Sequence, residues 1–394
     1  MKVTIFSDCH CGFEFGSERG EDPFEALEEV MRRASDSDLI IIAGDLFDSR
    51  VPKQEVFAKT AKILSAAKKG GTGARLVRIE GKDEVPDLAL RGIPVVVIHG
   101  THERRSIHMV NPVQALEHAG LVLHLHLATA VFEIGGRLVA VHGMSGVPER
   151  YAADVLREWS PKPVEGAVNI FVFHQSVREF IYSPLDPPSI SIEDLPDGFD
   201  LYVLGHLHWR EVRPVKSGKL VLTGSLVSTT AHRRESEQEK GFYTFDGSEL
   251  EFHPLENQRR VYHLSAEYSA DLESRIDRLL SSVPESGKKP VVYLKIKGTV
   301  PKGSEVPDLS RLPQKYSSRM ILKIIQNLEE EEEGRTPVAL QHEKASPEEY
   351  GMAVLKRNLE AAGCRLGIDE IFDFLVEGNV DAVFDMLAGD GNDK

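Results

Sequence analysis

The amino-acid sequence predicts an α/β protein in which helices flank layered β-sheets. Over about the first 230 residues, short apolar segments typical of buried strands alternate with amphipathic segments typical of helices. Several of the apolar segments end in aspartate or histidine, and ligand sites in open α/β sheets lie at the carboxyl ends of the strands. The pattern changes near residue 256, where we expect a small α+β domain to begin.

Composition and charge are those of an ordinary globular protein. Of the 394 residues, 41% are apolar and 28% are charged. Three cysteines cannot form a disulfide framework, MKVTIFSD at the N-terminus has the pattern of a strand, and no apolar run approaches the ~20 residues that span a bilayer. We therefore expect a cytoplasmic protein with no membrane partner. The net charge of −15 argues against a uniformly basic nucleic-acid binder, but a local basic strip could still meet DNA.

The first part of the chain divides into a regular series of elements. The expected strands are VTIFSD (3–8), LIIIAGD (39–45), PVVVI (94–98), VNIFVFHQ (168–175), DLYVLGHLH (200–208), KLVLTGS (219–225) and GFYTFD (241–246). TAVFEIGGRLVAVHG (129–143) is expected to form a hairpin. Helices are expected over 21–34, 52–69 and 111–120. In the first and last of these, Asp22 and Asn111 precede a proline and are expected to act as N-caps.

The C-terminal part contains a second set of elements. Strands RRVYHLSAEY (259–268) and PVVYLKIKG (290–298), with a helix at about 270–283, suggest a small α+β domain. Five consecutive glutamates at 329–333 form a like-charge run typical of a linker. Two helical regions follow, at about 347–363 and 367–389. They form either a helical cluster packed against the body or a module that binds a partner helix.

Five strand ends carry residues suited to metal binding. FSDCH, AGDLFD, HGTHERR, VFHQ and VLGHLH supply Asp8, His10, Asp45, Asp48, His102, His174, His206 and His208. A histidine at a single strand end is usually an ordinary hydrogen-bonded residue, but all five groups together are hard to obtain by chance. Mixed imidazole and carboxylate ligands suit divalent manganese, iron, zinc or cobalt. Their number suits two ions, and Asp45 could bridge both.

These motifs resemble, in order and spacing, the five motifs of the calcineurin-like metallophosphoesterases. TGSLVSTTAHRRESEQEKGFYTFD (223–246) is similar to the stretch that closes the phosphoesterase domain of SbcD-type nucleases, which work in double-strand-break repair with an SMC-like coiled-coil ATPase. The resemblance implies a layered metallophosphoesterase β-sandwich flanked by helices, a small α+β capping domain and a C-terminal helical element.

The resemblance also implies a role for each motif residue. Asp8, His10, Asp45 and His208 would hold the first metal, and His174 and His206 the second. His102 would act on the scissile phosphate as a catalytic residue, oriented by Glu103. Two Mn²⁺ ions are the implied cofactors, with other divalent transition metals as alternatives. Arg104, Arg105, Arg233 and Arg234 are the candidates for contacts with the DNA backbone.

One position departs from the family pattern. The family has Gly-Asn-His-Asp where this chain has Gly100, Thr101, His102 and Glu103. The family's asparagine gives a carbonyl oxygen to the second metal, whereas Thr101 offers only a hydroxyl on a shorter side chain. We expect Thr101 to be a poorer ligand, so that activity depends more steeply on metal concentration.

Other histidines and acids are interpreted as structural. Asp48 is expected to support the site rather than bind metal. His124 and His126 lie on one face of a strand without a nearby carboxylate and are expected to be partly exposed. His142 follows a strand and could lie near the rim of the site.

The expected domain organisation follows from the motifs and the composition. Residues 1–255 would form the nuclease domain, 256–328 the capping domain that binds DNA, 329–345 an acidic linker, and 346–394 a helical element that docks a partner. The resemblance implies DNA, the ATPase and a second copy of the chain as partners.

The sequence is also compatible with two other functions. One keeps the chemistry and changes the substrate, giving a small-molecule phosphodiesterase or a phosphatase of the same superfamily. The other is a non-catalytic scaffold that bridges DNA, since Thr101 replaces the usual ligand. The seven remaining motif residues argue against a decayed site.

Overall fold

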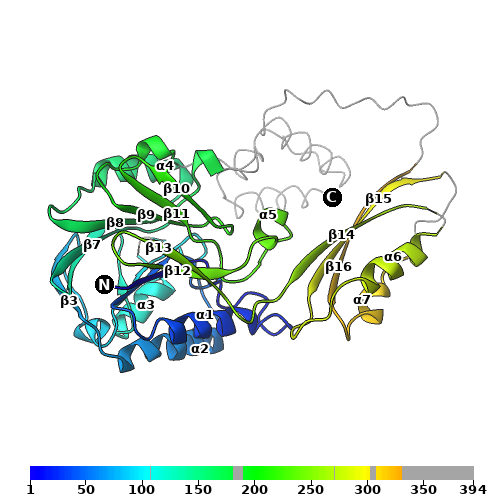
Figure 1. The fold of residues 1–394 in the computed structure, drawn as a ribbon, viewed down its shortest axis with the longest axis horizontal. Helices are drawn as coiled ribbons and strands as arrows, with labels where there is room; N and C mark the ends of the chain where they lie inside the picture. Colours follow the sequence, from blue (N-terminus) through cyan, green and yellow to red (C-terminus); the bar gives the residue numbers. More distant parts are fainter. Residues whose placement is uncertain (107, 181–189, 270, 302–307, 331–394) are drawn as a thin grey trace, which may run out of the picture. The chain divides into compact units, whose positions relative to one another are not determined.

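Three β-sheets form the framework of the residues that the structure describes (Figure 1). The structure is a computed structural model and describes residues 1–106, 108–180, 190–269, 271–301 and 308–330. Two sheets pack face to face and carry helices on their outer faces, which confirms the predicted α/β sandwich. The helices expected at 347–363 and 367–389 lie outside the described residues.

The first sheet has six strands in the order β13-β12-β1-β2-β4-β5. Its strands are β1 (Val3–Phe6), β2 (Leu39–Ala43), β4 (Val95–Ile98), β5 (Leu123–His124), β12 (Gly241–Phe245) and β13 (Leu250–Pro254). β1, β2, β4 and β5 run parallel, and β12 and β13 extend the edge in antiparallel fashion. β2 and β4 are apolar on both faces because helices cover one face and the second sheet covers the other.

The second sheet has seven strands in the order β10-β11-β9-β8-β7-β6-β3. Its strands are β3 (Ala74–Glu80), β6 (Ala128–Ile134), β7 (Arg137–Met144), β8 (Ala167–His174), β9 (Leu201–Gly205), β10 (Glu211–Val215) and β11 (Gly218–Leu222). β7, β8, β9 and β11 are parallel, so their carboxyl ends meet at one edge. β6 and β7 form the predicted hairpin.

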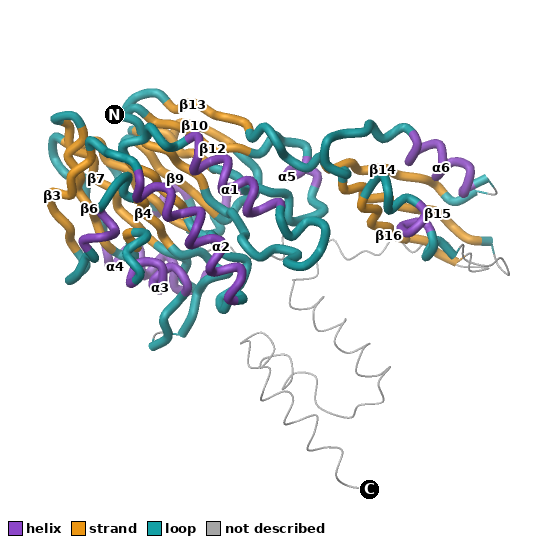
Figure 2. The backbone as a smooth tube through the Cα atoms, turned by 90° about the horizontal axis from the view of Figure 1, so that it is seen from below, coloured by secondary structure: helices purple, strands orange, loops and turns teal. Residues whose placement is uncertain are grey.

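Helices cover the outer faces of the sandwich. The first sheet carries α1 (Asp22–Arg33), α2 (Gln54–Leu64) and α3 (Pro112–His118), and the second carries α4 (Glu149–Trp159). α1 and α2 lie side by side in both views (Figures 1 and 2). Asn111 caps α3 as predicted, since its side chain accepts from the backbone of Gln114 at 2.8 Å. Asp22 makes no cap and instead pairs with Arg259, Oδ2 to Nε 2.6 Å.

The third sheet is a parallel three-stranded sheet with its own core. It contains β14 (Val261–Glu267), β15 (Val291–Val300) and β16 (Ile321–Glu330), joined through α6 (Leu272–Ser281) and α7 (Leu312–Lys315). Ile276 and Leu280 of α6 belong to one apolar cluster with Val292 and Leu294 of β15. β16 includes Glu329 and Glu330, so this strand extends two residues into the expected linker. The predicted domain boundaries remain proposals.

The sequence did not predict several of the helices and strands. β3, β10 and α4 were not expected, and β3 shows no apolar run because four of its seven residues are exposed at the sheet edge. α5 (Arg233–Ser236) is a single turn within a charged stretch. Among the described residues, none of the helices combines the length and apolar character needed to cross a bilayer.

His142 lies in the protein core. It is 1% exposed, its Nδ1 lies 2.9 Å from the Thr129 hydroxyl, and its Nε2 lies 3.2 Å from Asn169 Oδ1. Burial lowers the pKa of His142 to about 4, because the charged imidazolium would lose its hydration. This histidine therefore has a structural role in β7.

The stability of the protein should fall on acidification through His142. The unfolded state takes up the proton near pH 6.5 and the folded state only near pH 4, so stability present above pH 6.5 is lost by about 1.4 kcal/mol per pH unit between these values. Urea unfolding at pH 7.5, 5.5 and 4.5 should show a shallower decline in His142→Gln than in the wild type. Equal declines would contradict this origin.

Candidate metal centre

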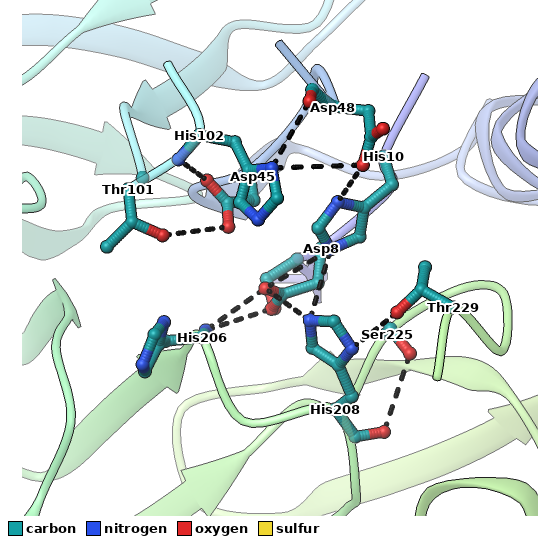
Figure 3. A network of polar contacts seen from close by, with 12 residues as sticks. Asp8, His10, Asp45, Asp48, Thr101, His102, His206, His208, Ser225 and Thr229 are labelled. Carbon is teal, nitrogen blue, oxygen red and sulfur yellow. Dashed lines mark hydrogen bonds and ion pairs between the residues drawn. The ribbon is translucent and has the colours of Figure 1, made fainter. Parts of the chain in front are cut away.

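The predicted site residues meet at the carboxyl ends of the parallel strands of both large sheets (Figure 3). Asp8 and His10 follow β1, Asp45 and Asp48 follow β2, and His102 follows β4, whereas His174 ends β8 and His206 and His208 follow β9. Both edges supply candidate ligands because the two sheets stack with their parallel strands ending on the same side. The prediction that these segments converge is therefore confirmed.

The backbone of this site is strained at four residues. Asp8, His10, Asp45 and His206 have φ values of 50°, 49°, 48° and 80°, in the left-handed region that residues with a Cβ avoid. Backbone hydrogen bonds hold the first turns, from Asp8 N to Gly44 O and from His10 N to Asp45 O, both at 3.0 Å. The turns aim these side chains into the space between the two sheet edges.

Asp8, His10 and His208 form one group of possible metal ligands. His10 Nδ1 lies 3.0 Å from Asp48 Oδ1, and His208 Nδ1 lies 2.9 Å from the Thr229 hydroxyl. If each Nδ1 carries the ring proton, both Nε2 atoms present lone pairs, and these two atoms are only 3.1 Å apart. Two facing lone pairs repel each other unless a cation lies between them, so the group fits a metal ion.

Asp8, Asp45 and His174 form a second group, entirely buried. His174 Nδ1 lies 2.8 Å from the Ala43 carbonyl, which can only accept, so Nδ1 carries a proton. His174 Nε2 faces the Asp45 carboxylate, with Oδ2 3.2 Å away. Since only a cation, either a proton or a metal ion, can lie favourably between this buried nitrogen and the carboxylate, the group also fits a metal ion.

The charges of Asp45 and His174 depend on each other. Burial opposes charge on both, but their mutual attraction outweighs it, so the pKa of Asp45 is held well below its usual range and that of His174 is raised to about 9. In the metal-free protein a proton on His174 therefore balances Asp45. A metal ion at this place would displace that proton, and the affinity for metal should rise with pH.

The loop after β4 is tied to Asp45 and Asp48. Asp45 Oδ1 accepts from His102 N at 2.9 Å, and the Thr101 hydroxyl donates to Asp45 Oδ2 at 3.4 Å. His102 Nδ1 lies 3.2 Å from the carbonyl oxygen of Asp48, so His102 Nε2 stays available on a half-exposed ring. Thr101 thus contacts the candidate ligand Asp45 and forms part of the site.

Glu103 has a different place from the one expected. It is fully buried, and its two oxygens accept from Phe47 N and Gly100 N, each at 2.9 Å. Burial, followed by the charge of Asp45, raises the pKa of Glu103 to about 8. His102 is contacted by Asp48 and not by Glu103, so the prediction that Glu103 orients His102 is wrong. Glu103 instead connects the loops after β2 and β4.

His206 stands next to the second group. Its backbone N donates to both oxygens of Asp8 at 3.1 Å, and its ring centroid lies 5.3 Å from that of His174 in an edge-to-face contact. Burial and the charge of His174 lower the pKa of His206 to about 4, so the ring is neutral and able to bind a metal. Its role as a ligand remains a proposal.

The four candidate arginines differ in their surroundings. Arg105 donates to the Val110 carbonyl at 3.3 Å, and Arg234 pairs with Glu211 at 3.1 Å and covers the ring of Trp209. Arg233 is exposed and Arg104 is half-buried. Contact of these side chains with DNA stays a prediction.

His124 differs from its expected state. The sequence predicted a partly exposed side chain, but His124 is only 5% exposed, because its ring lies against the buried side chains of His99 and Ser145. Its Nε2 lies 2.9 Å from Nδ1 of His99, and burial lowers the pKa of both histidines, that of His99 to about 3. His126 is partly buried, as expected.

Sequence reasoning missed Glu235, which supports His208 from α5. Glu235 is 2% exposed and lies 3.4 Å from His208 Nδ1. Burial alone would raise the pKa of Glu235, but His208 and Lys240 hold it well below its usual range. Glu235 lies in the charged stretch RRESEQEK, where an acid looks solvated. No pattern in the sequence marks it as buried.

Comparison with known proteins identifies the family. Residues 1–210 match the family described as calcineurin-like phosphoesterase. The chain belongs to this family. The resemblance drawn from the motifs is thereby confirmed, and members of such a metallophosphoesterase family use divalent metals.

Individual relatives are double-strand-break repair proteins. The DNA double-strand break repair protein Mre11 of Methanopyrus kandleri is 30% identical over 227 residues, which are 53% of this chain and 44% of that protein. The human double-strand break repair protein MRE11 is 26% identical over 303 residues, 66% of this chain and 42% of that protein. Mre11 of Sulfurisphaera tokodaii is 25% identical over 326 residues, which are 79% of this chain and 77% of that protein. The chain thus matches less than half the length of the first two relatives.

Gly100 should be indispensable for metal binding. A Cβ at Gly100 would lie 2.2 Å from Asp45 Oδ1, so Gly100→Ala must displace either this loop or the Asp45 carboxylate. We expect Mn²⁺ affinity, measured by isothermal titration calorimetry, to fall at least tenfold. Gly71→Ala is the control, since a Cβ there meets nothing within 4 Å. Unchanged affinity in Gly100→Ala would contradict the assigned role of Asp45.

Proposed function

We propose that the chain is a manganese-dependent, two-metal phosphodiesterase that cleaves DNA at ends during double-strand-break repair. The observation that carries the metal part is the pair of donor groups that share Asp8. In each group a histidine nitrogen faces only hydrogen-bond acceptors, so a cation, either a proton or a metal ion, is needed between them. The names of the relatives support DNA repair as the context. Nuclease action on DNA ends rests on their similarity and on the site chemistry together.

The residues divide into two proposed metal sites and a catalytic histidine. Asp8, His10 and His208 would hold the first ion, and His174 and His206 the second, with Asp45 between them. Bound divalent ions would neutralise phosphate charge and lower the pKa of water. His102 Nδ1 contacts the Asp48 carbonyl oxygen, so Nε2 is the nitrogen that would bind the phosphate or protonate the leaving oxygen.

DNA and two protein partners complete the proposal. The third sheet would act as the capping domain that guides DNA, and residues 346–394 would dock the coiled-coil ATPase. A homodimer is proposed from the same resemblance. Exposed Val51, Met109 and Val110, in the segments after Asp48 and His102, offer apolar surface suited to a second copy.

Cleavage of DNA should require His102. With end-labelled duplex DNA and a Mn²⁺ titration, we expect the wild type to cut and His102→Ala to lose at least about 100-fold in rate, the usual range for general acid–base groups. His118→Ala is a matched control, because His118 is exposed on α3. If folded wild type cuts no DNA at any Mn²⁺ concentration but hydrolyses bis(p-nitrophenyl) phosphate, the small-substrate alternative gains. Inactivity on both substrates favours the scaffold.

Thr101 should limit the affinity of the second metal. Thr101→Asn would place an amide oxygen where the hydroxyl now contacts Asp45. We expect the dissociation constant of the second, more weakly bound Mn²⁺ ion to fall about tenfold. The Mn²⁺ concentration for half-maximal cleavage should fall in parallel. Thr101→Val keeps the shape without an oxygen and should show no gain. A Thr101→Asn protein with wild-type affinity would count against this role.

A further inference from the structure

A buried polar network surrounds the side of His208 that faces away from the proposed metal. The Glu235 carboxylate lies at its centre and belongs to α5, while His208 follows β9. Oε1 of Glu235 accepts from Thr229 N at 2.8 Å and from the Thr229 hydroxyl at 3.4 Å. Oε2 accepts from Thr230 N at 3.1 Å and from the Thr230 hydroxyl.

Lys240 completes this network from the opposite side. Its ammonium group lies 3.6 Å from Glu235 Oε1 and donates to Ser225 Oγ at 2.8 Å and to the His208 carbonyl at 3.0 Å. Glu235 and Lys240 are 2% and 5% exposed, so bulk water hydrates neither charge. Because one buried charge without the other would be costly, the two residues act as a unit.

The direction of hydrogen bonding in this network is determined by Glu235. An ionised carboxylate can only accept, so the Thr229 hydroxyl donates its hydrogen to Glu235 and accepts one from His208 Nδ1, 2.9 Å away. The proton of the imidazole is thereby held at Nδ1, which also lies 3.4 Å from Glu235 Oε1 itself. The lone pair of Nε2 then faces His10 Nε2 and Asp8, at 3.1 Å and 3.6 Å.

We propose that Glu235 is a positioning residue which, through Thr229 and with Lys240 as its counter-ion, holds His208 in the one tautomer and orientation that can bind the first metal. This inference rests on the proposed metal site but not on DNA as the substrate. Outer partners of this kind orient metal-binding histidines and raise their basicity, and their loss typically weakens metal affinity or activity about 10- to 100-fold.

Two threonines provide a matched pair of variants. Thr229→Val removes the hydroxyl between Glu235 and His208, and Thr230→Val removes a hydroxyl that binds the other oxygen of the same carboxylate and has no link to His208. Both changes preserve the shape of the side chain. Glu235→Gln tests the carboxylate itself, and Glu237→Gln removes an exposed acid at the end of the same turn.

The experiment measures metal binding and imidazole tautomer in the full chain. Mn²⁺ binding is followed by electron paramagnetic resonance of free Mn²⁺, and the His208 tautomer by long-range ¹H–¹⁵N spectra of the metal-free protein. We expect Thr229→Val and Glu235→Gln to weaken the first Mn²⁺ site at least tenfold and to lose the pure Nδ1–H tautomer. Thr230→Val and Glu237→Gln should match the wild type in both measurements.

The outcomes separate positioning from a purely structural role. Wild-type affinity and tautomer in Thr229→Val and Glu235→Gln would overturn the proposal, as would an equal loss in Thr230→Val, which would indicate general damage to the loop. If Glu235→Gln fails to fold, Thr229→Val decides, because it leaves the carboxylate and its bonds to the backbone intact. Weakened Mn²⁺ binding in a protein that never cuts DNA would retain this inference and reject the proposed substrate.

Discussion

Two aspartates buried at one place impose the main constraint on this structure. Asp8 and Asp45 are 0% and 1% exposed, and oxygens of both lie with His174 Nε2 inside one group whose atoms are within 4.8 Å of each other. Two negative charges so close in a poorly solvated site repel strongly unless cations balance them. The arrangement of histidines around them meets this need, by a proton on His174 in the metal-free protein and by metal ions in the proposed active state.

The strained turns follow from the same constraint. A strand that continued straight past Phe6 or Ala43 would carry its carboxylate away from the partner sheet, whereas left-handed residues at Asp8 and Asp45 turn the side chains inward. Each such residue costs on the order of 1–3 kcal/mol and persists only when its surroundings enforce it. Glu103, which ties the loops after β2 and β4 together through Phe47 and Gly100, is one of the groups that enforce it.

The sequence predicted the parts of the molecule that depend on local pattern. Apolar segments identified β1, β2, β4, β8 and β9, and the polar residues at their ends identified the candidate metal-binding groups, because the carboxyl ends of parallel strands meet. Prediction from the sequence failed where tertiary contacts determine the structure. Edge strand β3 has no apolar run, Glu103 and Glu235 look like solvated acids in charged stretches, and the burial of His124 depends on its contacts with His99 and Ser145.

The number of metal ions bound by each chain tests the account most directly. Equilibrium dialysis of the wild-type protein against Mn²⁺, with metal counted by atomic absorption, measures this number without reference to any substrate. The two donor groups around Asp8 and Asp45 predict two ions per chain at saturation, the second bound more weakly. A protein that saturates with one ion, or binds none, would contradict the two-metal centre.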